Sequence, residues 1–267
     1  MDVSRRSALS MTAAGLIHVA ADPLKSLGAT PANSNELLIR QAAERGHTDL
    51  GWLKSFHSFS FGGYYDQRHM GFRSLRVIND DKIAAGQGFP THPHRDMEII
   101  SYVLDGALQH KDSTGRGAII RPDDIQMMSA GTGITHSEYN PSRSDSNHFL
   151  QIWIKPSMRR VQPRYSDAKV TADQKQNQWR KIAGPDGSDG AVSIYQDAHI
   201  YATKLTAGAE IDFTVEHGRH AWLQVARGRL EVNGASLGTG DAVATSRATQ
   251  LHARAVEETD ALLFELA

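Results

Sequence analysis

The sequence of 267 residues contains no cysteine. Disulfide bonds, thiolate metal sites and cysteine nucleophiles are therefore excluded. A surplus of charge is also missing, because 29 basic residues are balanced by 30 acidic ones and the formal net charge is -1. The protein as a whole is thus not attracted to a phosphate backbone, and we expect no nucleic-acid partner. Without thiols, any metal ion must be held by imidazole and carboxylate groups, so the 13 histidines are the first candidates.

Long apolar runs are absent as well, and no segment is expected to span a membrane. The weakly apolar residues 11–21 are too short for a bilayer, but they follow Arg5 and Arg6 and precede small residues at 28–32. This order is typical of an export signal, and the paired arginines resemble a twin-arginine signal. We therefore predict that residues 1–34 are a twin-arginine-type signal that directs the protein to the periplasm. The alternative is an N-terminal extension of a cytoplasmic protein.

The rest of the sequence indicates short strands separated by glycine, proline, asparagine and aspartate. After a short helix expected over residues 35–45, the pattern predicts strands at residues 74–78, 98–104, 118–121 and 148–155. The first of these is predicted to end at a turn formed by Asn79, Asp80 and Asp81. Strands at this spacing are typical of an all-β sandwich or barrel.

Similar spacing returns after a polar segment at residues 157–190, which is predicted to be a connection with a short helix near 172–179. Further strands are expected at residues 222–226, 230–232 and 261–266, and Asn233-Gly234 is a strong hairpin signal. Val103-Leu104-Asp105-Gly106 is similar in outline to Val225-Ala226-Arg227-Gly228. We therefore predict two tandem β-barrels, with the following domains: an N-terminal metal-binding barrel at 35–160, a linker at 161–194 and a C-terminal barrel without metal ligands at 195–267.

Two histidines in the first half have the spacing of metal ligands. Side chains of a strand alternate between its faces, so His92 and His94 project the same way, with Cα atoms ~6.5 Å apart. Imidazoles at this spacing can converge on one ion at about 2.1 Å each. Glu98 has the same parity and points to the same face if no bulge intervenes. Pro93 cannot donate a ladder hydrogen bond, which places the stretch at a strand start or a sheet edge.

A second same-face pair follows at His136 and Glu138, after a bend allowed by Gly131 and Gly133. Two such pairs on two strands can supply three nitrogens and one oxygen. This donor set suits first-row divalent metals and leaves two positions open on an ion that prefers six ligands. A lone His-x-His pair is often a surface feature, and it is the combination with His-x-Glu that favours a metal site.

The role of Glu98 stays open at this stage. It can be a fourth ligand, a carboxylate that orients a ligating histidine, or a buried salt-bridge partner. Between the two carboxylates we prefer Glu138 as the ligand. The predicted metal ligands are therefore His92, His94, His136 and Glu138.

At these residues the sequence resembles the cupins, because Gly86, His92, His94 and Glu98 match the first cupin motif. The second motif departs from the usual cupin pattern, with its metal histidine displaced to His136. That displacement is similar to the pirin family, and in particular to its bacterial members described as quercetin 2,3-dioxygenases. The resemblance is strong over residues 47–165 and weak over 195–267. It is carried by Gly51-Trp52-Leu53, Phe56 to Phe61, Tyr64-Tyr65-Asp66, Gly71-Phe72, Arg76 to Asp81, His92 to Glu98 and Ser129 to Asn140.

The resemblance implies a bicupin fold with one metal ion, held in the N-terminal barrel. The family's ligands fall on His92, His94, His136 and Glu138, and all four are intact. The expected cofactor is one divalent cation, iron(II) first, with nickel, copper, cobalt or zinc as alternatives. In the C-terminal half His217, His220 and His252 form no such pair and are interpreted as ordinary surface or loop residues.

The resemblance also implies an activity, the oxidative ring cleavage of a flavonol such as quercetin by dioxygen. The flavonol would bind the metal through its 3-hydroxyl and 4-keto oxygens, and the family reaction releases carbon monoxide and a depside. Glu138 is the candidate catalytic base for the 3-hydroxyl proton, with Glu98 in reserve. His57, Phe59, Phe61 and Gln151 are the candidates for the wall of the aromatic pocket.

Two other functions are compatible with the same residues. Some pirins are described as non-catalytic regulatory proteins, in which the metal is structural or senses redox state. Export to the periplasm would argue against a nuclear or cytoplasmic regulatory role. The second of these alternatives is a metal-dependent enzyme that acts on another substrate, since cupins catalyse many different reactions.

Overall fold

The structure is a computed structural model that describes residues 37–267. The predicted export signal at residues 1–34 lies outside the described residues and stays a prediction. Within residues 37–267 the chain forms twenty-two strands, one short α-helix and two 3-10 turns. No helix of the described part is long and apolar enough to cross a bilayer.

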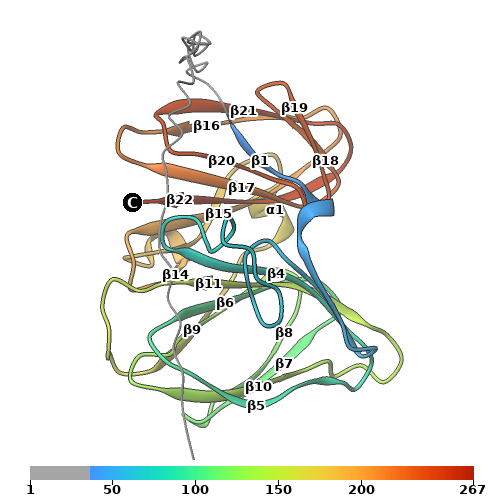
Figure 1. Ribbon diagram of the computed structural model, residues 1–267, viewed down its shortest axis with the longest axis vertical. Helices are drawn as coiled ribbons and strands as arrows, with labels where there is room; N and C mark the ends of the chain where they lie inside the picture. Colours follow the sequence, from blue (N-terminus) through green and yellow to red (C-terminus); the bar gives the residue numbers. More distant parts are fainter. Residues whose placement is uncertain (1–36) are drawn as a thin grey trace, which may run out of the picture. The chain divides into compact units, whose positions relative to one another are not determined.

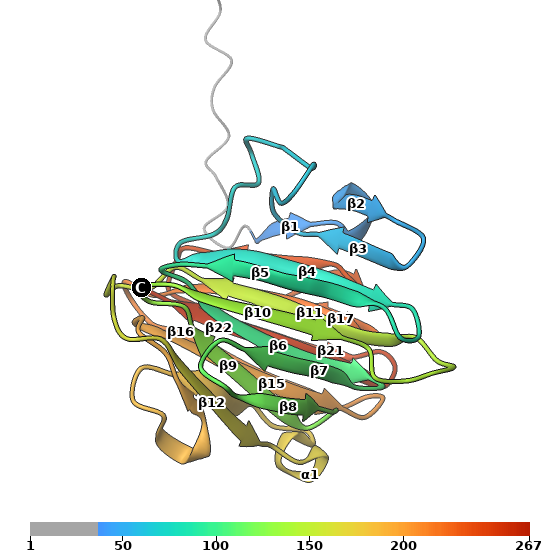
Figure 2. The ribbon, with the colours of Figure 1, turned by 90° about the horizontal axis from the view of Figure 1, so that it is seen from below.

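The first barrel is enclosed by a seven-stranded and a four-stranded sheet (Figures 1 and 2). In sheet order the seven strands are β12 (Arg164–Lys169), β9 (Asp124–Ser129), β6 (Glu98–Asp105), β11 (Asn147–Ile154), β4 (Leu75–Ile83), β3 (Leu53–His57) and β2 (Gly46–Asp49). The four are β5 (Gly88–His94), β10 (Ile134–Tyr139), β7 (Leu108–Asp112) and β8 (Gly117–Ile120). Figure 2 shows β10 between β5 and β7.

The second barrel has the same composition of sheets. Its seven strands are β1 (Leu38–Arg40), β20 (Ala242–Thr245), β17 (His220–Arg227), β22 (Thr259–Leu266), β15 (Ala198–Leu205), β13 (Arg180–Gly184) and β14 (Val192–Ser193). Its four are β16 (Glu210–Val215), β21 (Thr249–Ala255), β18 (Arg229–Val232) and β19 (Ala235–Gly238). The tandem barrels confirm the predicted all-β bicupin fold.

The largest apolar core lies between the two seven-stranded sheets, which face each other in Figure 1. Alternation of side chains along the strands contributes to it. On β6, Ile100, Tyr102 and Leu104 pack into this shared core, whereas Ile99 and Val103 belong to apolar clusters on the other face, inside the first barrel. Residues of one strand therefore either join the two barrels or line the interior of the first one.

The two barrel interiors differ in what fills them. In the second barrel the interior is an apolar cluster of thirteen buried residues, among them Leu205, Leu223 and Leu263. In the first barrel the apolar residues form two smaller clusters, one of six buried residues around Leu108 and Phe149 and one of four that includes Ile99. These smaller clusters leave room in the first barrel for polar side chains and for a cavity.

Two segments differ from their predictions because tertiary pairing outweighs local propensity. The helix expected at residues 35–45 is instead β1 followed by a 3-10 turn, Ala42–Glu44. β1 hydrogen-bonds to β20 of the second barrel, and the Arg40 guanidinium donates to the Ser58 carbonyl oxygen at 3.2 Å. A segment that pairs with a sheet edge gains backbone hydrogen bonds to the neighbouring strand, and these outweigh its local preference for a helix.

The interval 161–194, predicted as a linker, contributes strands to both barrels. β12 extends the first barrel's sheet beside β9, while β13 and β14 belong to the second. The helix predicted near 172–179 is the single turn α1 (Ala172–Lys175), which begins at a capping box formed by Thr171 and Gln174. A further 3-10 turn lies at Ser188–Gly190.

The turn predicted at Asn79, Asp80 and Asp81 is wrong. β4 continues through these residues to Ile83, with Asn79 opposite Gln151 and Asp81 opposite Phe149 on β11. All three polar residues are buried. Their side chains make contacts inside the protein, which a turn signal in the sequence does not indicate. The hairpin at Asn233-Gly234, by contrast, is confirmed, with positive φ values of 48° and 84° between β18 and β19.

Candidate metal centre and its cavity

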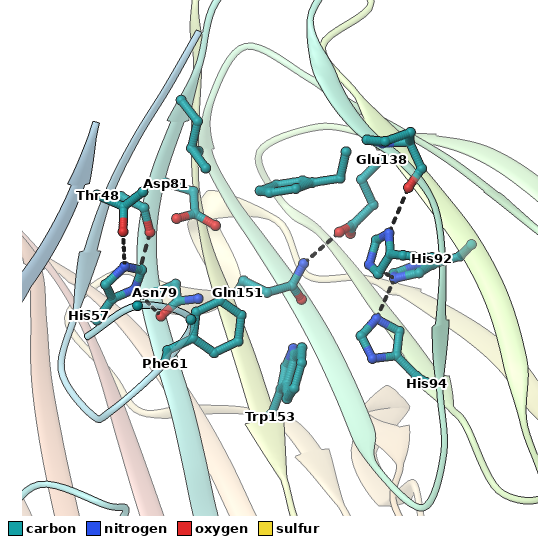
Figure 3. A pocket seen from close by; sticks show the side chains of 17 residues that line it. Thr48, His57, Phe61, Asn79, Asp81, His92, His94, Glu138, Gln151 and Trp153 are labelled. Carbon is teal, nitrogen blue, oxygen red and sulfur yellow. Dashed lines mark hydrogen bonds between the residues drawn. The ribbon is translucent and has the colours of Figure 1, made fainter. Parts of the chain in front are cut away.

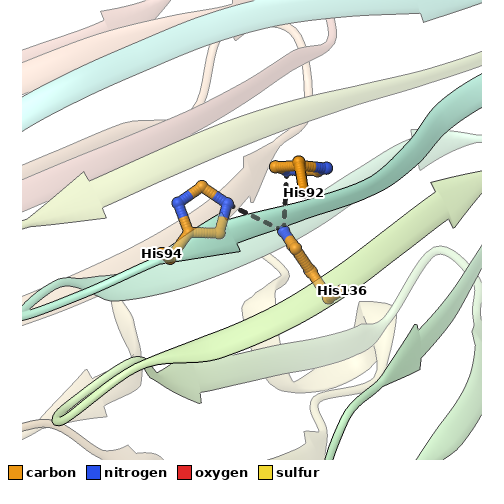
Figure 4. Close-up of side chains that lie close together, drawn as sticks. All are labelled: His92, His94 and His136. Carbon is orange, nitrogen blue, oxygen red and sulfur yellow. Dashed lines mark hydrogen bonds between the residues drawn. The ribbon is translucent and has the colours of Figure 1, made fainter.

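Three of the predicted ligands converge on the inner face of the first barrel (Figure 4). The antiparallel register of β5 and β10 places His92 directly opposite His136. His94 follows two residues along β5 and therefore shares the face of His92. The His136 Nε2 atom lies 3.1 Å from Nε2 of His92 and 2.9 Å from Nε2 of His94.

These distances fit a common metal ion. Two nitrogens that each lie 2.1 Å from one ion at a right angle are about 3.0 Å apart. The lone pairs are also available. A carbonyl oxygen can only accept, so in the 2.8 Å contact with the Pro90 carbonyl Nδ1 of His92 is the donor, and Nε2 is the nitrogen turned toward His136.

The protonation states of the other two histidines favour metal binding in the same way. Burial, helped by the neighbouring histidines, lowers the pKa of His94 to about 4 and that of His136 to about 3. Both rings are therefore neutral near pH 7 and need not lose a proton before they coordinate a metal.

Glu138 lies beside this triad and is held by two other side chains. The Ser101 hydroxyl donates to Oε1 at 3.2 Å and the Gln151 amide donates to Oε2 at 2.8 Å. A β-bulge separates Glu138 from His136 in the pairing with β5. Its carboxylate lies within 4.8 Å of ligand atoms of His136 and of a further histidine, His110. The role of Glu138 as the fourth ligand stays a prediction.

Glu98 is not part of this centre, which corrects its assignment as an alternative ligand or reserve base. The chain between His94 and Glu98 leaves the extended conformation, with a φ of 48° at Asp96, so strand parity does not carry across. Glu98 shares the face of Ile100 and points toward the second barrel, where it accepts from Ser129 Oγ at 2.7 Å and the Tyr195 amide at 3.1 Å. Burial raises the pKa of its carboxyl.

His110 and Asp112 of β7 were missed by the sequence analysis. Both side chains are fully buried, and His110 is one of the residues grouped around His136. The signal was present in the sequence, because Leu108, His110 and Asp112 alternate with exposed residues along one strand. What the sequence does not show is that β7 pairs with β10.

A cavity of about 390 Å³ opens on the triad (Figure 3). Its apolar wall consists mainly of Leu53, Phe61, Phe89 and Trp153. Three of the four predicted wall residues, His57, Phe61 and Gln151, do line it. Phe59 does not, because it faces the core between the barrels, where its ring centroid lies 4.8 Å from that of Trp222.

The cavity wall away from the triad is polar. His57 lies between two partners: Thr48 Oγ1 is 2.9 Å from its Nε2 atom, and Asn79 Oδ1 is 2.8 Å from its Nδ1 atom. Asp81 lines the same wall, and its Oδ1 atom has no hydrogen-bond partner in the protein. Figure 3 shows Asp81, Asn79 and His57 on the opposite side of the cavity from His92 and His94.

Asp81 should make the stability of the protein depend on pH. Burial, with smaller contributions from the charges of Asp80 and Glu138, raises its pKa from 3.8 to about 7. Between these values the unfolded chain releases the proton while the folded protein keeps it, so the free energy of unfolding falls as pH rises. Each pKa unit is worth about 1.4 kcal/mol, so the loss should be a few kcal/mol.

Urea unfolding of the metal-free protein at about pH 5 and pH 7.5 measures this effect. We expect Asp81→Asn to lose less stability than the wild type over the same interval, because asparagine does not ionise. An equal pH dependence in the two proteins would contradict the raised pKa of Asp81.

Within residues 37–267, both groups of three or more side chains with ligand atoms close enough to hold one ion lie in the first barrel. Of the C-terminal histidines, His252 is exposed and pairs with Asp212 at 2.6 Å. His217 and His220 do not belong to either group.

Comparison with known proteins identifies the same two halves. The family described as Pirin matches residues 39–154, and the one described as Quercetinase C-terminal cupin domain matches residues 181–266. The quercetin 2,3-dioxygenase of Escherichia coli K12 is 43% identical over 230 residues, which cover 86% of this chain and 98% of that protein.

Solved structures show the same relationship. The crystal structure of YhhW from Escherichia coli has a TM-score of 0.83 at 42% identity and covers 87% of this chain and 98% of its own. A structure described as bacterial pirin YhhW in complex with nickel(II) has a TM-score of 0.82 at 41% identity, covering 86% and 99%. With the family matched across both barrels and relatives above 40% identity over nearly their whole length, this chain belongs to the pirin family.

Proposed function

We propose that the protein is a metal-dependent quercetin 2,3-dioxygenase. The observation that carries the proposal is the opening of three convergent imidazoles on an aromatic-walled cavity. A cavity of about 390 Å³ lies in the range of roughly 300–1,000 Å³ that is usual for small-molecule sites. The name of the Escherichia coli relative and the nickel(II) complex of the bacterial pirin support the activity and the metal.

The residues present fit one divalent cation, with iron(II) as the expected ion and nickel(II) as the ion named for the relative. His92, His94 and His136 would hold it, with Glu138 as the fourth ligand. Such an ion would supply Lewis-acid activation of a 3-hydroxy-4-keto group and a site for dioxygen. Nitrogen and oxygen donors do not by themselves select among the first-row metals.

The protein's own contribution is to orient the substrate and to accept a proton. Phe61, Phe89 and Trp153 present aromatic surfaces against which planar rings can pack. Glu138 takes the 3-hydroxyl proton, and the donors Ser101 and Gln151 hold its carboxylate in place. In the overall reaction both oxygen atoms of dioxygen enter the cleaved product, and one ring carbon leaves as carbon monoxide.

Purified protein loaded separately with iron(II) and nickel(II) should consume quercetin and dioxygen together, with loss of the flavonol absorbance. His92→Ala should lose this turnover, because one of the three nitrogens is removed. His252→Ala, which alters an exposed histidine of the second barrel, is the matched control and should behave as wild type. Full metal occupancy without turnover of any flavonol would refute the oxygenase and favour a non-catalytic role.

A further inference from the structure

The imidazole of His136 lies between two groups of side chains. In the four-stranded sheet β10 runs between β5 and β7, so the ring has His92 and His94 on one side and His110 on the other. Its Nε2 atom faces His92 and His94 at 3.1 and 2.9 Å. Its Nδ1 atom lies 3.4 Å from Nδ1 of His110, at the long end of the hydrogen-bond range.

The neighbours of His110 determine which of its nitrogens carries the proton. Its Nε2 atom lies 3.2 Å from Oδ2 of Asp112, and a carboxylate can only accept. Its Nδ1 atom lies 3.3 Å from the Gln126 amide nitrogen, which can only donate. Both contacts require the same tautomer, with the proton on Nε2 and a lone pair on Nδ1.

That lone pair is the one presented to His136. The Nδ1–H group of His136 can donate to it, which leaves Nε2 of His136 without a proton and pointing at the other two ligands. We propose that Asp112 and His110 are positioning residues that fix the tautomer and ring orientation of His136 for metal binding. The inference rests on the metal centre of the proposed function but does not depend on a flavonol substrate.

Because these contacts are buried, the loss of one of them should have a large effect on metal binding. The side chains of His110 and Asp112 have no exposed surface, so water cannot replace a lost partner. His110 is not placed to bind the same ion, because it faces Nδ1 of His136, whereas His92 and His94 face Nε2. Removing a group that orients a ligating histidine typically weakens metal binding by about 10–100-fold.

Asp112→Asn is the sharpest test because its geometry is constrained. Oδ1 of Asp112 accepts from the Thr114 amide at 2.8 Å and the Thr114 hydroxyl at 2.6 Å. The asparagine oxygen should take that position, so its NH₂ group faces His110 and donates to Nε2. His110 must then carry its proton on Nδ1, and His136 is driven to the tautomer that blocks its Nε2 atom.

We expect Asp112→Asn to raise the nickel(II) dissociation constant by about 10–100-fold, measured by competition with a chelating dye. His110→Leu should also weaken binding, whereas His110→Gln, whose amide oxygen can accept from His136, should recover part of the loss. Asp212→Asn makes the same change in the exposed pair with His252 and should leave the dissociation constant unaltered.

A second readout does not require any variant to fold. Nitrogen-15 NMR of the metal-free wild type should show His136 protonated on Nδ1 and His110 protonated on Nε2. The proposal fails if His136 carries its proton on Nε2, or if folded Asp112→Asn binds nickel(II) as tightly as the wild type. Neither result depends on whether quercetin is turned over, so this inference and the oxygenase can fail separately.

Discussion

Replacing His136 with alanine should weaken metal binding strongly, because its Nε2 atom is the one within about 3 Å of both other imidazoles. Structural metal sites with four ligands contribute apparent binding energies of about 10–16 kcal/mol, so one lost ligand should cost about 3 kcal/mol or more. That corresponds to roughly a 100-fold higher dissociation constant. Elemental analysis after dialysis and calorimetric titration with nickel(II) measure the loss.

Two variants bracket this result. His252→Ala should retain the metal, because His252 lies exposed in the second barrel. His110→Leu should weaken binding but retain a measurable site. Equimolar nickel(II) in dialysed His136→Ala, with an unchanged dissociation constant, would show that the three imidazoles do not form the centre.

Truncating Phe59 and truncating Phe61 should affect different properties of the protein, although the two residues are only two positions apart. Phe59 is 2% exposed and packs on Trp222 in the core between the barrels. Phe59→Ala should lower the free energy of unfolding by about 3–5 kcal/mol, as large-to-small changes in a packed core do. Phe61 lines the cavity, 5.3 Å from Trp153 between ring centroids, so Phe61→Ala should instead weaken flavonol binding.

Denaturant unfolding of the metal-free proteins and equilibrium binding of quercetin separate the two effects. Each variant is the control for the other, since the same atoms are removed in both. Neither should change the nickel(II) dissociation constant, because a phenyl ring has no polar atom that could hold or orient a ligating nitrogen. A Phe61→Ala protein that binds quercetin normally would place the aromatic substrate elsewhere.

The histidine triad could be predicted from the sequence because each pair of candidate ligands lies within one strand. Alternation of side chains is a local rule, and it holds for His92 with His94 and for His136 with Glu138. The same rule failed for Glu98, because the turn around Asp96 lies between it and His94. Parity is informative within a strand and carries nothing across a turn.

The error at Asn79, Asp80 and Asp81 has a different cause. These residue types favour turns because their side chains compete for local backbone groups. Here Asn79 contacts His57, Asp80 accepts from His148 at 2.6 Å and Asp81 faces the cavity. Predictions from local sequence patterns tend to fail where polar residues form part of a functional site. Here the wrong turn prediction falls on residues that include the polar wall of the cavity.

Pairings between distant segments could not be predicted from a single sequence. β1 joins the second barrel although some two hundred residues separate it from β20, and β7 brings His110 to His136. Neither pairing leaves a local signature. The positioning role of Asp112 and His110 therefore became visible only when the strand order was known.

Because the two barrel interiors are filled differently, one barrel contributes mainly to stability and the other holds the candidate site. A barrel whose interior holds imidazoles, carboxylates and empty space forgoes the apolar burial that would otherwise hold it together. The second barrel, solidly packed inside and joined to the first through a continuous apolar layer, supplies cohesion to the pair. The first barrel can therefore tolerate substitutions of its inner residues, so its chemistry can change while the second barrel maintains the stability of the fold.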